Sequence, residues 1–236
     1  MLGGLYMKRP HVICHMTVSI DGKVTGDFLG RDECVPATEI YYMLNRDYIA
    51  EAFGCGRVTM EESFTGGWFP DLDDFKDKKI AHVDYIADAN AERYAIAFDR
   101  KGNLGWKVSH LEDTDPGYDK CHIVEVLTDE VDDAYLAYLQ SVGISYIFAG
   151  KRDLNLGTAL EKLTEYFGIQ NLLLEGGSIL NEAFLRADLI DELSLVQAPV
   201  VAGKNCKALF NDGVFCEFRL KEVHKVKGVL WVSYER

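Results

Sequence analysis

The chain has little positive charge and no long apolar run. Its 236 residues include 25 Lys and Arg against 38 Asp and Glu, which gives a net charge of −13. Because phosphate backbones attract basic surfaces, this balance argues against a general nucleic-acid or anionic-membrane binder, although a local basic pocket could hold a small anion. No window approaches the length of a transmembrane span, and residues 1–10 contain no apolar run of signal-peptide length. We therefore expect a soluble, cytoplasmic protein.

The six cysteines form no Cys-x-x-Cys pair. Their spacing gives neither a zinc site nor a disulfide framework, so we expect no bound metal and a reducing compartment. The chain also has no Rossmann Gly-x-Gly-x-x-Gly, Walker A, Gly-x-Ser-x-Gly or His-Glu-x-x-His sequence. The lack of Cys-x-x-Cys excludes a zinc-dependent deaminase as well. These absences remove several large classes of enzyme.

What the chain does have is an alternation of strand and helix patterns. At 48% hydrophobic it can form one sizeable domain, and no linker rich in Pro, Gly or Ser divides it, so we expect one domain over residues 1–236. Apolar runs predict strands at 11–19, 94–98, 122–127, 144–149, 172–174, 191–201, 218–223 and 229–234. Helical periodicity predicts helices at 36–52, 131–142, 156–167 and 178–187, and residues 55–60 predict a short strand turning into a helix.

The order of these elements predicts an α/β fold. We expect a mainly parallel central sheet with right-handed crossovers and flanking helices. No helix pattern separates the last strands, and residues 224–228 are typical of the connection of an antiparallel hairpin that closes the sheet at the C-terminus. Residues 66–79 predict a surface loop, in which Trp68, Phe69 and Phe75 could form a lid over a substrate.

Residues 172–181 are the most informative stretch. Three Leu residues lead to Glu175, then to Gly176 and Gly177, and Ser178 is an N-cap candidate for the following helix. A turn without Cβ atoms lets a ligand approach the backbone, and a helix start favours an anion such as a phosphate. For a lone Gly-Gly pair the usual explanation is only a tight turn. Glu175 at the carboxyl end of the strand, where open α/β sheets bind ligands, favours a site.

Other predicted strands also end in small residues or cations. Gly56 and Thr59 could hold a phosphate through the backbone and a hydroxyl, and Arg57 could pair with it. Arg100 could read the 2′-phosphate of NADPH, and Gly150 precedes further cations. Taken singly, a helix cap or a solvated turn explains each of them. If all lie on one sheet edge, they suit a dinucleotide phosphate chain.

The first strand carries polar residues on one face. His15, Thr17 and Ser19 share that face, and Asp21 follows in a turn. This pattern indicates either a wet cavity or a hydrogen-bonded core. A satisfied core His with an Asx turn at Asp21 is an equally good explanation.

These residues resemble the reductase domain of bacterial riboflavin biosynthesis. Residues 15–23 resemble its SxDGK start, and residues 56–59 resemble its GRxT turn. Residues 174–177, 189–193 and 198–203 resemble its EGG…LiDEl…aPvl.G signature. The match runs in order over nearly the whole chain. The resemblance is to the RibD C-terminal family of the dihydrofolate reductase-like superfamily, and it implies the dihydrofolate reductase fold.

The resemblance implies a homodimeric reductase that uses NADPH to reduce a small molecule. In the riboflavin enzymes the substrate is a ribosylamino-pyrimidinone phosphate, whose ring-opened ribose carbonyl accepts a hydride to become a ribityl group. Carried over residue by residue, Glu175 and His15 would face the substrate. The NADPH site would be lined by Thr17, Gly56, Arg57, Thr59, Gly176, Gly177 and Ser178.

The chain departs from that family where the substrate binds. The bacterial enzymes usually carry Lys at the position of His15, and they have an Asn-Pro-x-Leu-x-x-Arg segment for the sugar phosphate where this chain has residues 61–68. The deaminase half of the bifunctional enzymes is also missing. The sequence therefore leaves the substrate open.

Hydride transfer to a carbonyl needs a donor in contact and a group that neutralises the forming alkoxide. We hypothesise that His15 is this acid or electrophile, because His titrates near neutral pH. Glu175 would orient a substrate hydroxyl or amine, or fix the tautomer of His15. Asp21 and Ser19 would anchor the turn that covers the nicotinamide.

Two other functions stay open. One is a pterin reductase, which would need a carboxylate facing the pterin from a helix, with Glu39 and Asp47 as candidates. The other is a non-catalytic nucleotide-binding protein that keeps the fold.

Overall fold

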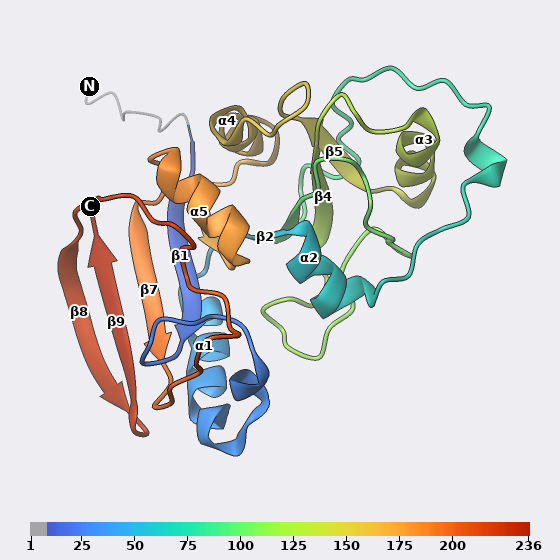
Figure 1. The fold of residues 1–236 in the computed structure, drawn as a ribbon. Helices are drawn as coiled ribbons and strands as arrows, with labels where there is room; N and C mark the ends of the chain where they lie inside the picture. Colours follow the sequence, from blue (N-terminus) through green and yellow to red (C-terminus); the bar gives the residue numbers. More distant parts are fainter. Residues whose placement is uncertain (1–8) are drawn as a thin grey trace, which may run out of the picture.

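A nine-stranded sheet organises the protein (Figure 1). The computed structural model describes residues 9–236. Residues 1–8 lie outside the described residues, and they belong to the segment in which we expect no signal peptide. The strand order is β5-β4-β3-β2-β6-β1-β7-β9-β8. The strands are β1 (His11–Val18), β2 (Ala52–Gly56), β3 (Tyr94–Phe98), β4 (His122–Leu127), β5 (Ser145–Phe148), β6 (Asn171–Leu174), β7 (Glu192–Gln197), β8 (Arg219–Val226) and β9 (Val229–Glu235).

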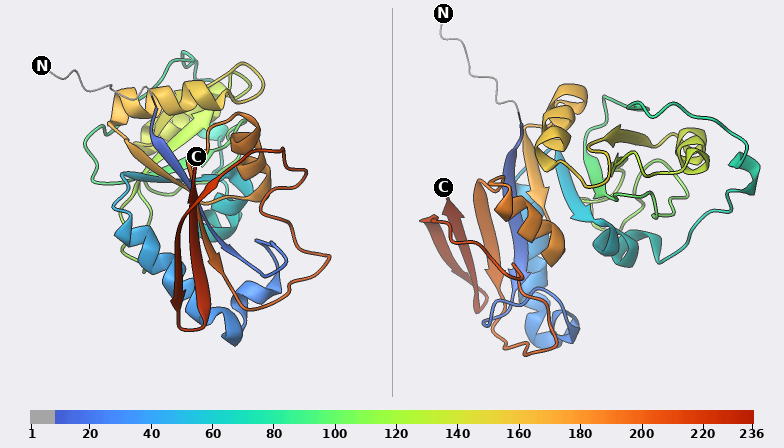
Figure 2. Two further views of the ribbon diagram at one scale, coloured as in Figure 1. Left: turned by 90° about the vertical axis from the view of Figure 1, so that its left-hand side faces the viewer. Right: turned by 45° about the horizontal axis from the view of Figure 1, so that its top comes forward.

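The pairing confirms the predicted α/β class. Strands β1 to β7 pair only in parallel with one another, and β9 runs antiparallel to both β7 and β8. The C-terminal hairpin lies at one end of the sheet, and β4 and β5 lie at the other (Figure 2). In residues 9–236 no helix is both long and apolar enough to cross a bilayer.

Helices cover both faces of the sheet. Side chains alternate along β1, so Val12 and Cys14 pack on one face with α4 (Leu156–Phe167) and α5 (Ser178–Arg186). On the other face, α3 (Asp133–Val142) packs over β3, β4 and β5, and α1 (Val35–Asp47) packs near β7. The short helix α2 (Arg57–Met60) follows β2 directly. Both faces are therefore buried, as the apolar runs of the central strands require.

Helix α4 begins and ends where its pattern predicts, at residues 156 and 167. Asn155 caps it, because its side-chain oxygen accepts a hydrogen bond from Thr158 N at 3.0 Å. The predicted helix over 36–52 is too long, because α1 ends at Asp47 and Ala52 begins β2. Gly54, just beyond the predicted helix, lies inside β2, where an added Cβ would lie 3.1 Å from Phe98 Cε2.

Two further local predictions are corrected. Ser178 is not the N-cap of α5: Gly177 is, and no side chain caps this helix start. The hairpin connection is shorter than residues 224–228, because β8 continues to Val226 and only Lys227 and Gly228 turn. Both turn residues have positive φ, 51° and 84°, which suits a two-residue hairpin turn. The predicted surface loop at 66–79 contains one short 3-10 helix, Asp73–Phe75.

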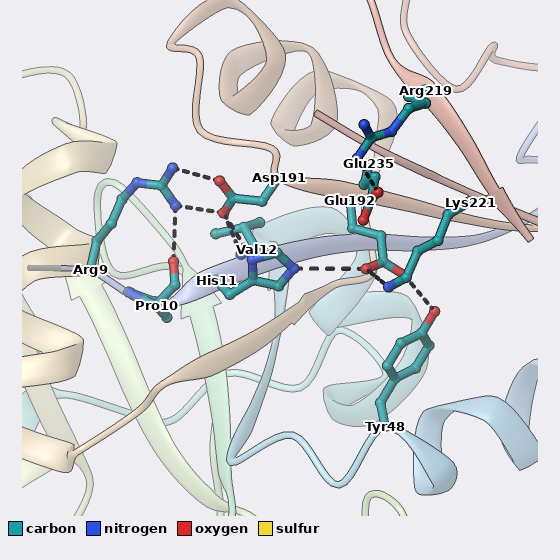
Figure 3. A network of polar contacts seen from close by, with 10 residues as sticks. All are labelled: Arg9, Pro10, His11, Val12, Tyr48, Asp191, Glu192, Arg219, Lys221 and Glu235. Atoms are coloured by element: carbon teal, nitrogen blue, oxygen red, sulfur yellow. Dashed lines mark hydrogen bonds and ion pairs between the residues drawn. The ribbon is translucent and has the colours of Figure 1, made fainter. Parts of the chain in front are cut away.

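A network of polar contacts ties the start of β1 to β7 and β8 (Figure 3). Arg9 donates two hydrogen bonds to Asp191, at 2.6 and 2.8 Å, and Val12 N donates a third at 2.8 Å. Next to it, buried Glu192 accepts from Lys221 Nζ at 2.6 Å. Burial opposes ionisation of Asp191, but the bonds from Arg9 and Val12 outweigh it and hold the pKa of this carboxyl below its usual value.

We expect the Asp191→Ala variant to lower the free energy of unfolding by about 1–2 kcal/mol at neutral pH, because a half-buried bidentate pair is lost. The pKa of Asp191 in the folded state lies below its ordinary value of 3.8. The stability that the pair contributes is therefore fully present above pH 3.8, and it is lost as the pH falls through the folded-state pKa. Urea denaturation at neutral and acid pH measures it. Glu39→Ala, which breaks an exposed pair with Lys227, is the matched control and should cost less than about 0.5 kcal/mol. Equal losses in the two variants would contradict this account.

Candidate functional site

The carboxyl ends of six parallel strands lie along one edge of the sheet, as the prediction required. Neighbouring strands are about 4.8 Å apart, so this edge extends roughly 24 Å from β5 to β1. In spatial order it carries Gly150 after β5, Arg100 after β3, Gly56 at the end of β2, Gly176 after β6 and Ser19 after β1. An extended ligand crossing the edge would meet these groups in turn.

At the middle of this edge, two of the predicted turns touch. Gly56 N donates to Gly176 O at 2.7 Å. A Cβ on Gly177 would lie 3.2 Å from Thr59 Oγ1, so the hydroxyl and the glycine backbone share one small space. Gly176 has φ +97°, a conformation that side chains rarely adopt. The structure therefore brings Gly56, Thr59, Gly176 and Gly177 together, and we call these four residues the glycine cradle.

Two polar side chains flank the glycine cradle. Ser178 is buried, and its Oγ has no hydrogen-bond partner within residues 9–236. Arg57 is half-buried and pairs with Glu61 Oε2 at 2.5 Å. An orphaned buried hydroxyl and a nearby guanidinium fit a polar, anionic ligand.

Arg100 and Gly150 form a separate group toward the β5 end of the edge. Arg100 is exposed and pairs with Asp153 Oδ1 at 2.8 Å. A Cβ on Gly150 would lie 2.1 Å from Asp153 O, so this turn needs glycine for a close backbone approach. Both residues meet at Asp153 rather than at the glycine cradle.

At the β1 end, Ser19 and Asp21 anchor the backbone. Ser19 Oγ donates to Asp21 at 2.6 Å, and Asp21 also accepts from Ala202 N at 2.9 Å and Gly203 N at 3.0 Å. These bonds, that from Ser19 first, lower the pKa of Asp21 to about 2. Asp21 therefore holds two loops together as a permanent carboxylate. This geometry fits the turn-anchoring role expected for Asp21. Thr17 lies half-buried on β1, on the same face as His15.

A cavity of about 490 Å³ opens beside the glycine cradle. It includes Thr59 from the cradle and Glu175, the residue before Gly176. Its size lies in the range of small-molecule sites. It is lined by Tyr41, Tyr42, Phe53, Cys55, Thr59, Ser63, Phe64, Asp113, Thr114, Asp115, Tyr118 and Glu175.

Glu175 is the buried carboxyl group of this cavity. Its side chain accepts from Asn45 Nδ2 at 2.5 Å and from the Tyr118 hydroxyl at 2.8 Å. Burial raises the pKa of Glu175 to about 7, and the hydrogen bonds from Asn45 and Tyr118 limit the rise. A carboxyl that titrates near neutral pH can both donate and accept a proton under physiological conditions.

The structure does not place His15 in the cavity, which corrects its expected role as the acid facing the substrate. His15 is fully buried, with Nε2 3.0 Å from Tyr41 O and Nδ1 3.0 Å from Ser194 Oγ. Tyr41 O can only accept, so Nε2 carries the proton and Ser194 donates to Nδ1. Burial lowers the pKa of His15 to about 4, so the ring is neutral. The alternative of a hydrogen-bonded core histidine fits this geometry.

His15 still acts on the cavity indirectly. Its ring stacks on Tyr41 with centroids 4.4 Å apart and planes 5° apart. Tyr41 in turn lines the cavity. His15 therefore positions α1 and Tyr41 rather than the substrate.

Sequence reasoning missed Tyr41, Asn45 and Tyr118. The first two are four residues apart on one face of α1. Asn45 is the polar member of the otherwise apolar series Ala37, Ile40, Tyr41 and Leu44, which is a signal that could have marked that face. Tyr118 lies in an irregular loop, where periodicity gives no signal. The helix carboxylates considered for a pterin reductase, Glu39 and Asp47, are both exposed, which corrects that assignment. Within residues 9–236 no group of His, Cys, Asp and Glu could hold a metal ion.

The Glu175→Gln variant should remove a pH dependence of stability. The folded-state pKa of about 7 is above the ordinary 4.5, so the wild-type carboxyl costs increasing stability as pH rises from 4.5 through 7. Relative to wild type, the free energy of unfolding of the variant should rise by roughly 2–3 kcal/mol between about pH 5 and about pH 8. Urea unfolding at both pH values measures this, with Glu62→Gln at an exposed site as control. Parallel pH curves for wild type and variant would show that Glu175 titrates normally.

Comparisons with known proteins agree with this fold. A sequence model of the RibD C-terminal domain matches residues 112–231, slightly more than half of the chain. The chain is 39% identical over 67 residues to the 2,5-diamino-6-ribosylamino-4(3H)-pyrimidinone 5′-phosphate reductase of Methanothermobacter thermautotrophicus. That match covers 28% of this chain and 31% of the relative.

Two solved structures share the fold. The RibD structure of Acinetobacter baumannii, form 2, has a TM-score of 0.65 at 20% identity, covering 97% of this chain and 58% of that one. A pyrimidine reductase-like protein of Corynebacterium diphtheriae has a TM-score of 0.67 at 15% identity, covering 96% of this chain and 91% of that one. The chain thus spans little more than half the length of the Acinetobacter protein. With the family match and the dihydrofolate reductase-like fold, the protein belongs to the RibD C-terminal domain family.

Proposed function

We propose that this protein is an NADPH-dependent oxidoreductase that reduces a small heterocyclic substrate, as a pyrimidine reductase of the riboflavin-pathway type. The reaction that the family implies converts a 5-amino-6-ribosylamino-pyrimidine phosphate to its ribityl form. One observation carries the proposal: Glu175, with a pKa of about 7, lies in a cavity of small-molecule size and directly precedes the glycine cradle. A proton donor and a dinucleotide-binding turn are thereby adjacent.

The residues along the sheet edge fit a dinucleotide. The three glycines of the glycine cradle have no Cβ atoms, which would let a diphosphate approach its backbone, and the buried Ser178 hydroxyl has no partner among the described residues. Arg57 and Arg100 would face phosphates, with Gly150 allowing close approach near Arg100, and Thr17 and Ser19 would lie toward the nicotinamide end. When bound, the cofactor supplies a hydride.

Glu175 is the group that handles the proton. Reduction of a C=O or C=N bond leaves a basic oxygen or nitrogen that must be protonated. Burial keeps part of the Glu175 population protonated at neutral pH, and Asn45 and Tyr118 hold the carboxyl in place. The rings of Tyr41, Phe53 and Tyr118 give flat surfaces against which a heterocycle can stack.

We also propose a cytoplasmic homodimer without nucleic-acid or membrane partners. Strand β8 is an edge strand whose residues are exposed on both faces, except half-buried Val226. Its apolar side chains Leu220 and Val223 are 54% and 53% exposed. An edge strand of this kind favours pairing with a second chain.

The Gly177→Ala variant tests the cofactor site. An added methyl group would lie 3.2 Å from Thr59 Oγ1 and occupy space that the diphosphate needs. Because Gly177 has an ordinary negative φ of −76°, the fold should tolerate the change. We expect NADPH binding, measured by calorimetry, to weaken at least about tenfold. Gly30→Ala, with open space around the added Cβ, is the matched control. Undiminished binding in Gly177→Ala would place the cofactor elsewhere.

The Glu175→Gln variant tests catalysis. We expect kcat for substrate-dependent NADPH oxidation to fall at least about 100-fold, because general acid catalysis is lost, with cofactor affinity unchanged. Assays with the riboflavin-pathway intermediate and with a pterin separate those two reactions. Cofactor binding without turnover of any heterocycle would support the non-catalytic alternative instead.

A further inference from the structure

The two hydrogen-bond donors of Glu175 both depend on one loop residue, Gly117. A Cβ added to Gly117 would lie 2.6 Å from Asn45 Oδ1, so the Asn45 side chain packs directly on this backbone. Asn45 Nδ2 then donates to Glu175 Oε1 at 2.5 Å. Tyr118, the residue after Gly117, donates to Glu175 Oε2 at 2.8 Å. The position of Gly117 therefore helps to fix how the carboxyl group of Glu175 is held.

Gly117 is held in turn by Arg93. This half-buried residue directly precedes β3, and its Nη1 donates a hydrogen bond to Gly117 O. Contacts therefore run from Arg93 through Gly117 to both donors of Glu175. Arg93 does not itself line the cavity, so it can act on the site only through these groups and through its charge.

The charge of Arg93 is not neutralised by a carboxylate. Within residues 9–236 it forms no ion pair, and its Nε and Nη2 are buried without a hydrogen-bond partner. A guanidinium group keeps its proton in proteins, so the charge is permanent. A half-buried cation without a counter-ion acts on neighbouring ionisable groups more strongly than a paired, solvated one.

Glu175 is one of the groups that this charge reaches. Burial raises the pKa of Glu175, the bonds from Asn45 and Tyr118 lower it, and the charge of Arg93 lowers it further. The electrostatic effect and the contacts through Gly117 thus favour the same form of Glu175, the carboxylate.

The other titratable and charged groups around Glu175 come from α1, from β2 and from the loop before β4. They are Tyr41, Tyr42, Arg46, Cys55, Asp113, Asp115, Tyr118 and Cys121. Burial raises the pKa of each of these tyrosines and cysteines, so they are neutral at pH 7. Arg46 and Asp115 pair at 2.5 Å. Asp113 acts in the opposite sense to Arg93, and it is the same in every variant considered below.

We propose that Arg93 is a positioning residue, which holds the two donors of Glu175 through Gly117 and stabilises the carboxylate form of Glu175 by its charge. The proposal rests on the proposed function, since it concerns the proton donor of the same site. A buried carboxyl group without such a cation would keep its proton to higher pH, and an acid that holds its proton too tightly is a poor donor. Arg93 thereby sets the pH range in which Glu175 can work.

The first test follows the titration of Glu175 itself. It uses NMR of the full-length protein labelled with ¹³C at its Glu carboxyl groups, with Glu175→Gln to identify the signal. Arg93→Gln can still donate to Gly117 O but has no charge, so the Glu175 midpoint should rise by at least about 0.5 pH units. Arg93→Lys keeps the charge, and the midpoint should stay within about 0.3 pH units of wild type. Arg31→Gln, at an exposed site paired with Glu33, is the matched control and should leave the midpoint unchanged.

The second test is the pH dependence of kcat for substrate-dependent NADPH oxidation. Because a general acid must be protonated, kcat should fall as pH rises through the pKa of Glu175. In Arg93→Gln this fall should move to higher pH by the same amount as the NMR midpoint, and Arg93→Lys should restore it. A merely structural role of Arg93 would lower kcat at every pH without moving the fall.

Two results would overturn the proposal. One is an unchanged Glu175 midpoint in Arg93→Gln. The other is a midpoint in Arg93→Lys that rises by more than about 0.5 pH units, which would show that side-chain shape matters and charge does not. This second result can be obtained even if Arg93→Gln does not fold. A midpoint that moves in a protein without NADPH oxidation would sink the proposed reductase function and leave the effect of Arg93 on Glu175 standing.

Discussion

Glu175 is buried at the end of β6, and a buried carboxyl group must find hydrogen-bond donors or give up its charge. Asn45 and Tyr118 supply two donors, from a helix and from a loop that are distant in sequence. They stabilise the carboxylate only partly, so its pKa settles at about 7. This balance between desolvation and hydrogen bonding gives the cavity a group that titrates near neutral pH, and the two bonds tie α1 and the loop that carries Tyr118 to the end of β6.

The position of α1 depends in turn on the polar face of β1. His15 donates to the carbonyl of Tyr41 and accepts from Ser194, whose oxygen also accepts from Trp231 Nε1 at 3.0 Å. Every polar atom of this buried chain has a partner, so it can fix the helix without a charge. The sequence suggested that both His15 and Glu175 face the substrate. In the structure, His15 is neutral and positions the helix from behind the cavity, and Glu175 is the ionisable group inside it.

The parallel sheet explains why the glycine cradle and the cavity adjoin. Register pairs Gly54 with Leu174, so Gly176, two residues after β6, lies level with Gly56 at the end of β2, and the two turns meet. The turn after β6 contributes Glu175 to the cavity and Gly176 and Gly177 to the cradle. The proposed proton donor and the proposed phosphate-binding backbone come from three consecutive residues, which limits how far apart they can lie.

The sequence by itself determined the α/β class, the bounds of α4, the central strands and the residues of the glycine cradle, because apolar periodicity and glycine placement are local properties. It could not determine which buried polar groups meet. Asn45 reaches Glu175 across 130 positions and Tyr118 reaches it across 57, and such contacts depend on how helices and loops pack on the sheet. For the same reason the pattern around His15 was compatible with both a cavity and a core. Only the tertiary structure, through burial of its ring and the partners of its two nitrogens, decided for the core.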